Sequence, residues 1–303
     1  MIPKFPHFKK LELADKAEIE HITRKYPPYS DFNFISMWSW DTKGEIRICE
    51  LNGNLLVRFT DYVTSEPFYS FIGTNNVNET AYDLVKLAKS EGFRSELKLL
   101  PEISVEGIDK DKFIILEDKN NFDYVLLIHP LRLYNTQKTR SRKKSVRQLL
   151  ERHSCETRII DLSDSNQRKE IEVVFKKWSK HKDQQLTELE ETSNELLAMR
   201  RLIDKSKKIK FIPIGIYIDN KLAGFCFSEV LNDGFATSHF WKVNPEISTG
   251  LYAYLMQENA RILSEKGCEF INIEQDLGLP NLRKWKNSYD LHINLKKYIL
   301  ISV

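Results

Sequence analysis

The sequence contains little glycine, proline or cysteine: 11, 10 and 4 residues, respectively, in a chain of 303. This composition excludes a collagen-like or low-complexity chain, and a hydrophobic content of 41% is enough for a sizeable core. The cysteines have no CxxC spacing and the seven histidines form no HxxxH or HExxH pattern, so we expect neither a disulfide framework nor a metal site. The chain is about twice as long as a typical domain, which favours two lobes.

Long apolar runs are also absent. The longest lies near Tyr124–Ile128 and is far shorter than the roughly 20 residues that cross a bilayer. The first residues lack the apolar stretch of a signal peptide. We therefore expect a cytoplasmic protein without a transmembrane segment, and contact at the membrane periphery remains open. The oligomeric state is not indicated.

Positive charge is concentrated in the second half of the chain. Residues 1–130 carry 16 Lys and Arg against 21 Asp and Glu, whereas residues 131–303 carry 30 against 22. Much of the excess lies in one predicted helix, at 136–153. Its basic residues include Lys138, Arg140, Arg142, Lys143, Lys144 and Arg147. A solvated helix face is the usual explanation for such a run, but its imbalance favours an anionic partner, either RNA or lipid headgroups.

The predicted elements follow the same order in both halves. A hairpin, a strand, a helix and a strand are expected at 45–60, 68–72, 78–92 and 97–100. The same series is expected at 212–231, 235–242, 249–266 and 270–273. This repetition predicts an internal duplication and an α+β chain of two similar lobes, at 1–130 and 131–303. Additional helices, the basic helix among them, precede the second sheet.

A predicted strand–loop–helix unit in the second half could bind an anion. The loop ends in Ser248, Thr249, Gly250 and Leu251, where a helix N-terminus offers free backbone N–H groups to a phosphate or a polarised carbonyl. The alternative is that Ser248 or Thr249 only caps the helix and Gly250 eases a turn. Taken by itself, the loop favours this alternative.

A second candidate site follows the strand at 270–273. Ligands collect at the carboxyl ends of strands in open α/β-type sheets. Asp276 could act as a base or orient an acceptor amine, while Arg283 and Lys286 could hold a phosphate or carboxylate. A polar turn into a short solvated helix explains the same residues equally well.

Several motifs in the sequence resemble a known family. They are Tyr29-Ser30-Asp31-Phe32-Asn33-Phe34, Phe122-Asp123-Tyr124, the segment from Asp276 to Tyr289, and Lys296-Lys297-Tyr298. Together they are similar to the phosphatidylglycerol lysyltransferase C-terminal domain family, over nearly the whole chain. The resemblance implies two GNAT folds in tandem, each a mostly antiparallel mixed sheet flanked by helices. It also places Asp276, Arg283 and Lys286 on the family's final motif. Arg142 falls where family members often have Lys-Arg-Asn, and in this chain Lys143 follows the arginine.

The resemblance further implies transfer of an aminoacyl group from aminoacyl-tRNA to a lipid, or to a peptide as in Fem-type relatives. We expect an amine or hydroxyl of the acceptor to attack the activated carbonyl, with no tightly bound cofactor and with acyl-CoA or aminoacyl-tRNA as donor substrate. Two alternatives remain open: a CoA-dependent N-acyltransferase, and a non-catalytic module that binds RNA or anionic membrane.

Overall fold

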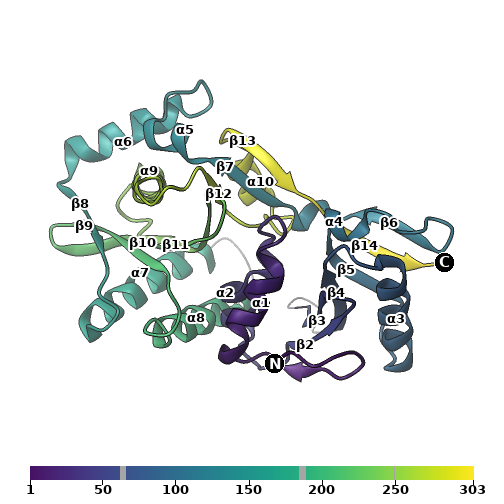
Figure 1. Cartoon of the computed structure of the whole chain (residues 1–303). Coiled ribbons are helices and arrows are strands. Elements are labelled where there is room, and N and C mark those ends of the chain that lie inside the picture. Colours follow the sequence, from purple (N-terminus) through teal and green to yellow (C-terminus); the bar gives the residue numbers. More distant parts are fainter. Residues whose placement is uncertain (62–65, 184–188, 249) are drawn as a thin grey trace. The chain divides into compact units, whose positions relative to one another are not determined.

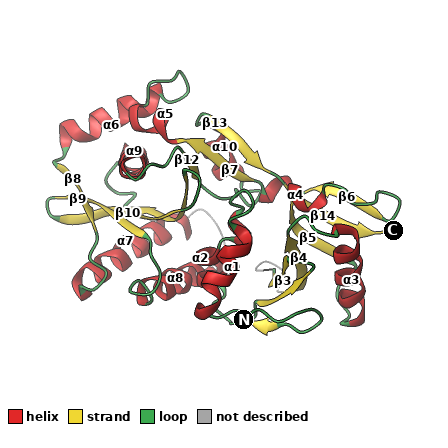
Figure 2. Cartoon of the chain, viewed as in Figure 1, coloured by secondary structure: helices red, strands yellow, loops and turns green. Residues whose placement is uncertain are grey.

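The computed structural model describes residues 1–61, 66–183, 189–248 and 250–303 (Figure 1). The chain forms two compact units. The first comprises Met1–Asp123, Gln275–Leu279 and Asn294–Val303, and the second comprises Tyr124–Glu274 and Pro280–Ile293. Each unit contains a seven-stranded sheet with helices packed against it (Figure 2).

The sheet of the first unit has the strand order β1-β2-β3-β4-β5-β14-β6. The strands are β1 (Lys9–Lys10), β2 (Arg47–Leu51), β3 (Asn54–Thr60), β4 (Pro67–Ile72), β5 (Glu96–Pro101), β14 (Lys297–Ser302) and β6 (Phe113–Glu117). The helices are α1 (Lys16–Thr23), α2 (Phe34–Trp40), α3 (Val77–Ser90) and α4 (Glu102–Val105). The apolar face of α3 packs on the sheet through Ala81, Leu84 and Ala88, whose helical spacing places them on one side.

The sheet of the second unit has the order β13-β7-β12-β11-β10-β9-β8. The strands are β13 (Leu291–Leu295), β7 (Asp123–Leu127), β12 (Phe270–Asn272), β11 (Phe235–Val243), β10 (Lys221–Val230), β9 (Ile212–Ile218) and β8 (Cys155–Ile159). The helices are α5 (Ile128–Leu133), α6 (Arg140–Arg152), α7 (Ser165–Asp183), α8 (Leu189–Asp204), α9 (Gly250–Glu265) and α10 (Pro280–Asn287). Helix α9 packs on both α6 and the sheet.

The predicted tandem α+β fold is confirmed. In both sheets an antiparallel hairpin and a third strand are followed by a helix and a strand parallel to the third. The series is β2-β3-β4-α3-β5 in the first unit and β9-β10-β11-α9-β12 in the second. β4 pairs with β5, and β11 pairs with β12, in parallel. The helix in each series supplies the crossover that a parallel pair requires.

Each sheet also contains one strand from the other half of the sequence. β14, at the C-terminal end of the chain, lies between β5 and β6, whereas β7 lies between β12 and β13. The compact units therefore interleave along the chain, unlike the predicted continuous lobes at 1–130 and 131–303. Sequence patterns indicate that a segment is a strand, but its neighbours depend on long-range pairing that the local pattern does not encode.

A buried ionic cluster anchors the first residue of β14. The ammonium of Lys297, which is fully buried, lies 2.8 Å from a carboxylate oxygen of Asp123 and also pairs with Asp31. Ser30 donates to both oxygens of Asp123, from its hydroxyl at 2.6 Å and from its backbone N–H at 2.8 Å. Burial by itself lowers the pKa of Lys297, but the two carboxylates outweigh burial and raise the pKa above its ordinary value.

Replacing Lys297 with methionine should lower the free energy of unfolding by about 3–5 kcal/mol, because Asp123 and Asp31 would stay buried without their counter-charge. Lys296→Met is the matched control: its side chain is 42% exposed and pairs with Glu102 and Glu117 at 3.4 and 3.9 Å. That variant should lose less than about 1 kcal/mol. Urea denaturation followed by circular dichroism measures both. Equal losses would mean that the buried cluster contributes no more than a surface pair.

Candidate functional site

Two parallel strands of the second unit separate at one point of the sheet. β11 and β12 pair in parallel from Phe235 with Phe270 to Thr237 with Asn272. β12 ends at Asn272, whereas β11 continues to Val243. Side chains just beyond this last pair therefore lie where the sheet opens at the carboxyl end of a strand, which is a common position for ligands.

A β-bulge places His239 at this point. Phe227 of β10 pairs with Phe240, and the next residue, Ser228, pairs with Ser238, so His239 has no partner in β10. A bulge of this kind leaves one extra residue out of the ladder and redirects its side chain. The side chain of His239 is only 1% exposed.

His239 lies between two glutamates from the neighbouring strands. Its Nδ1 is 3.2 Å from Oε1 of Glu274, which follows β12, and its Nε2 is 3.6 Å from Oε2 of Glu229 on β10. Burial alone would lower the pKa of His239, but hydrogen bonds and charges of Glu229 and Glu274 raise it to about 9. His239 is therefore a cation at neutral pH. Glu274 is the more accessible carboxylate, with 22% of its side chain exposed against 7% for Glu229.

The backbone of Glu274 is held by three neighbours. Lys286 of α10 is buried, and its ammonium donates to the carbonyls of Ile273 at 2.6 Å and of Glu274 at 2.8 Å. The N–H of Glu274 donates to the side chain of Asn272 at 2.7 Å, and its carbonyl accepts from Tyr124 N–H at 3.2 Å. Glu274 has a φ of 60°, a left-handed conformation that costs free energy in a residue with a Cβ. These bonds maintain it, so the contacts of Lys286 position Glu274.

Asp276 and Arg283, which the sequence predicts to share a cleft with Lys286, belong to different units. Asp276 belongs to the first unit, where its buried carboxylate accepts the N–H of Gly278 at 2.8 Å. Arg283 is half-buried on α10 in the second unit, one helical turn before Lys286. The expectation that Asp276, Arg283 and Lys286 share one cleft stays a prediction.

Helix α6 packs closely against Gly250 in the predicted anion site at 248–251. A Cβ on Gly250 would lie 2.5 Å from the carbonyl oxygen of Ser145, so glycine is required for α6 to approach this closely. The N–H groups of Gly250 and Leu251 already bond to Ser248, at its hydroxyl and its carbonyl, respectively. Thr249 lies outside the described residues. The bonds to Ser248 agree with the capping alternative, whereas Gly250 allows the close approach of α6. Binding of a donor phosphate here stays a prediction.

The basic residues of α6 divide between two faces of the helix. Val146 and Leu149 are buried toward α9. The exposed residues Arg140, Lys143, Lys144 and Arg147 follow the i, i+3, i+4, i+7 spacing of a single stripe. Arg147 pairs with Glu151 at 3.5 Å. The side chains of Arg140, Lys143, Lys144 and the preceding Lys138 have no hydrogen bond or ion pair with any described residue.

Arg142 is the exception among the predicted anion-binding residues. Its guanidinium lies 3.8 Å from the centroid of the Tyr289 ring and donates to the carbonyl of Ser288 at 2.9 Å. Both partners belong to the final motif of the sequence resemblance. Tyr289 is fully buried, and burial raises its pKa. The described contacts of Arg142 thus stabilise the interior of the second unit and differ from those of the exposed stripe.

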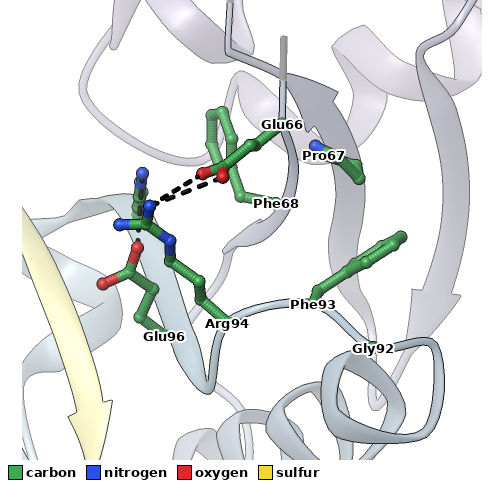
Figure 3. Close-up of a pocket in the computed structure, with 8 residues that line it drawn as sticks. Glu66, Pro67, Phe68, Gly92, Phe93, Arg94 and Glu96 are labelled. Carbon is green, nitrogen blue, oxygen red and sulfur yellow. Dashed lines mark hydrogen bonds and ion pairs between the residues drawn. The ribbon is translucent and has the colours of Figure 1, made fainter. Parts of the chain in front are cut away.

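A cavity of about 110 Å³ lies in the first unit (Figure 3). It is lined by Phe68, Phe93 and four charged residues that pair with one another. Arg94 lies 3.2 Å from Glu66, and Lys98 lies 3.3 Å from Glu96. No residue of the predicted sites lines it. We place the candidate site at His239 and Glu274 instead, because Glu274 lies where β11 and β12 separate.

The family model described as "Phosphatidylglycerol lysyltransferase, C-terminal" matches residues 23–301. The chain belongs to this family. Members of the family are aminoacyl transferases with aminoacyl-tRNA donors. No curated protein matches the chain. Among its described residues, no helix is long and apolar enough to cross a membrane, and no group of three or more His, Cys, Asp and Glu side chains could hold a metal ion.

Three solved structures share the fold. A conserved protein of unknown function from Bacteroides thetaiotaomicron has a TM-score of 0.85 at 23% identity, with 100% of each chain covered. The C-terminal domain of a proposed lysylphosphatidylglycerol synthetase from Agrobacterium fabrum has a TM-score of 0.64 at 12% identity, covering 96% of this chain and 92% of that one. L-PGS from Bacillus licheniformis has a TM-score of 0.61 at 9% identity, covering 99% and 93%. The tandem GNAT architecture is therefore that of this lysyltransferase family.

Sequence reasoning missed His239 and Glu229 as members of the site. His239 lies in a strand of mixed polarity, FATSHFWKV, with no charged residue next to it, and Glu229 is ten residues away in the sequence. One signal in the sequence could have indicated this site: three neighbouring strands of the predicted sheet each contain, or are directly followed by, one of the titratable residues Glu229, His239 and Glu274. Glu274 lay within the polar segment that the sequence singled out, but its partners come from β10 and β11.

The titration of His239 should make stability depend on pH. Because folding raises its pKa from 6.5 to about 9, the stabilisation is fully present below pH 6.5 and is lost as pH rises through 9. The unfolding free energy of wild type should exceed that of His239→Gln at about pH 6. This excess should be about 3 kcal/mol smaller at strongly alkaline pH, since one pKa unit corresponds to about 1.4 kcal/mol. Urea denaturation across this range measures the difference. His181→Gln, at an exposed position, is the control. A difference for His239→Gln that does not change with pH would contradict the raised pKa.

Proposed function

We propose that the protein transfers an aminoacyl group from aminoacyl-tRNA to an amine or hydroxyl of a lipid or peptide acceptor. The observation that carries this proposal is the accessible Glu274 carboxylate beside buried His239, at the point where the parallel strands β11 and β12 separate. Membership of the lysyltransferase family supports the donor class.

The chemistry requires one proton to move and no side-chain nucleophile. The ester that links an amino acid to tRNA is already activated, so an amine or hydroxyl can attack its carbonyl directly. The new bond to the carbonyl carbon forms as the bond to the ribose oxygen breaks. Glu274 accepts the proton of the attacking group and returns it to the leaving ribose oxygen. His239 holds Glu274 in position through the 3.2 Å contact, and Lys286 fixes the backbone of Glu274.

The exposed stripe on α6 fits a polyanionic donor. Lys138, Arg140, Lys143 and Lys144 have no ion pair among the described residues, so they can contact phosphates without first losing an internal partner. A row of such cations binds a nucleic-acid backbone mainly through release of counterions, independently of base sequence. We assign Arg142 no part in this contact, because it bonds to Ser288.

Glu274→Gln should reduce transfer by about 10²-fold or more, because the amide cannot accept the proton. The assay incubates the protein with tRNA charged with radiolabelled amino acids and counts label in extracted anionic lipid and in an amino-terminated peptide. Glu269→Gln, at an exposed position just before β12, is the matched control and should retain activity. Transfer from acetyl-CoA but from no charged tRNA would replace the proposal with CoA-dependent acylation. Binding of tRNA without any transfer would favour a non-catalytic module.

Replacing Arg140, Lys143 and Lys144 with glutamine should weaken tRNA binding and make it less sensitive to salt. The slope of log affinity against log salt concentration should fall in magnitude by up to about 3, since each lost phosphate contact contributes nearly one. Fluorescence anisotropy with uncharged tRNA at several salt concentrations measures the slope. The control replaces Lys205, Lys207 and Lys208, which are also exposed. An unchanged slope in the α6 variant, or an equal loss in both variants, would mean that the stripe on α6 is an ordinary solvated helix face and does not bind tRNA.

A further inference from the structure

Strand β6 forms an unprotected edge of the first unit's sheet (Figure 2). Its sequence, Phe113-Ile114-Ile115-Leu116-Glu117, has four apolar residues and no proline or lysine. An exposed edge offers unpaired N–H and C=O groups to another strand, and proteins usually block such edges with charges, prolines or very short strands.

The other edge strands of the two sheets show this protection. β1 consists of two lysines only. β8 carries Glu156 and Arg158, and β13 carries His292 and Asn294. Among the four edges of the described sheets, β6 is the one with a continuous apolar run.

The outward face beside β6 is also apolar. Ile114 and Leu116 are 49% and 46% exposed. Ile301 and Ile299 of β14 pair with them directly and are partly exposed. The alternate residues of β6, Phe113 and Ile115, point to the opposite face and pack in the core. Two adjacent strands therefore share one exposed apolar patch at an open edge.

The flanks of β6 carry charges in a self-complementary order. Asp111 and Lys112 precede the strand, and Asp118 and Lys119 follow it. If two copies of β6 pair antiparallel about Ile115, Lys112, just before the strand, faces Asp118, just after the strand, in the second copy. The register does not extend to Asp111, which lies in a turn, or to Lys119, which begins a 3-10 helix at Lys119–Asn121. Parallel pairing in register would instead place each charge opposite itself. We propose that a second copy of this chain binds at β6, forming a two-fold symmetric dimer through antiparallel strand pairing.

The backbone of β6 has the register that this pairing needs. Val303 N–H donates to the Lys112 carbonyl, and Asp118 N–H donates to the Lys297 carbonyl. Because residues of an antiparallel strand alternate in the direction of their backbone bonds, Phe113, Ile115 and Glu117 direct theirs to the open edge. The N–H of Phe113 is already used there, since it donates to the Asp109 carbonyl at 3.1 Å. Pairing about Ile115 aligns the N–H and C=O of the two Ile115 residues, and it places the Phe113 carbonyl opposite the Glu117 N–H of the second copy. The same pairing brings the apolar patches of the two copies side by side.

Sedimentation equilibrium across a broad concentration range tests the dimer. Wild type should show a monomer–dimer equilibrium. Ile114→Lys should weaken association by about 100-fold or more, because it places two charges in the apolar contact. Ile293→Lys is the matched control, an isoleucine 47% exposed on the edge strand β13, and should leave association unchanged.

A charge exchange distinguishes the proposed strand register from nonspecific hydrophobic association. Lys112→Asp or Asp118→Lys alone places like charges in both symmetric pairs, so each should weaken the dimer about 10-fold. The double variant restores opposite charges in both pairs and should recover wild-type association. A wild type that is monomeric throughout, a dimer indifferent to Ile114→Lys, or a double variant no better than the single ones would overturn the proposal. Monomeric protein that binds anionic vesicles through the patch would overturn it in favour of a lipid surface.

Discussion

The ion pair between Asp123 and Lys297 joins the first residues of β7 and β14. Each of these strands comes from one half of the sequence and belongs to the sheet formed mainly by the other half. Burying one ion costs several kcal/mol, so each requires the other, and Ser30 and Asp31 complete the set of partners. The pair therefore ties the point where the chain leaves the first sheet to the point where it returns.

Much of the fold could be predicted because hairpins and helices are local. Asn52-Gly53 is a strong turn signal, and both residues adopt the positive φ, 57° and 82°, that such a turn requires. The exchange of β7 and β14 could not be predicted in the same way. Both segments have the sequence of ordinary strands, and β14 pairs with β5, almost 200 residues earlier in the sequence. The two predicted repeats follow each other along the sequence, so the sequence alone favours two continuous lobes that meet at residue 130.

The candidate site was only partly predictable for a related reason. The polar segment after β12 indicated the right end of the strand and included both Glu274 and Lys286. The sequence could not show that Lys286 bonds to backbone carbonyls, because a lysine on a short amphipathic helix is normally solvated. His239 acquires its role from a bulge, which depends on how β10 and β11 align over their whole length. Arg142 was grouped with its basic neighbours, although helical spacing separates it from the stripe at Arg140, Lys143 and Lys144.

The residues that carry the family resemblance bond mainly to one another. Asp31, Asp123 and Lys297 form the buried cluster of the first unit, while Arg142 joins Ser288 and Tyr289 in the second. Side chains engaged in this way maintain the scaffold. A side chain that is to meet a substrate must be accessible, and Glu274 of the candidate site is 22% exposed at the point where β11 and β12 separate. The partly exposed carboxylate needs a cation behind it to hold its position, and buried His239 supplies one because Glu229 on its other side keeps it protonated. Three strands are thus required to present one carboxylate, which explains why the site lies at a bulge and where two strands separate.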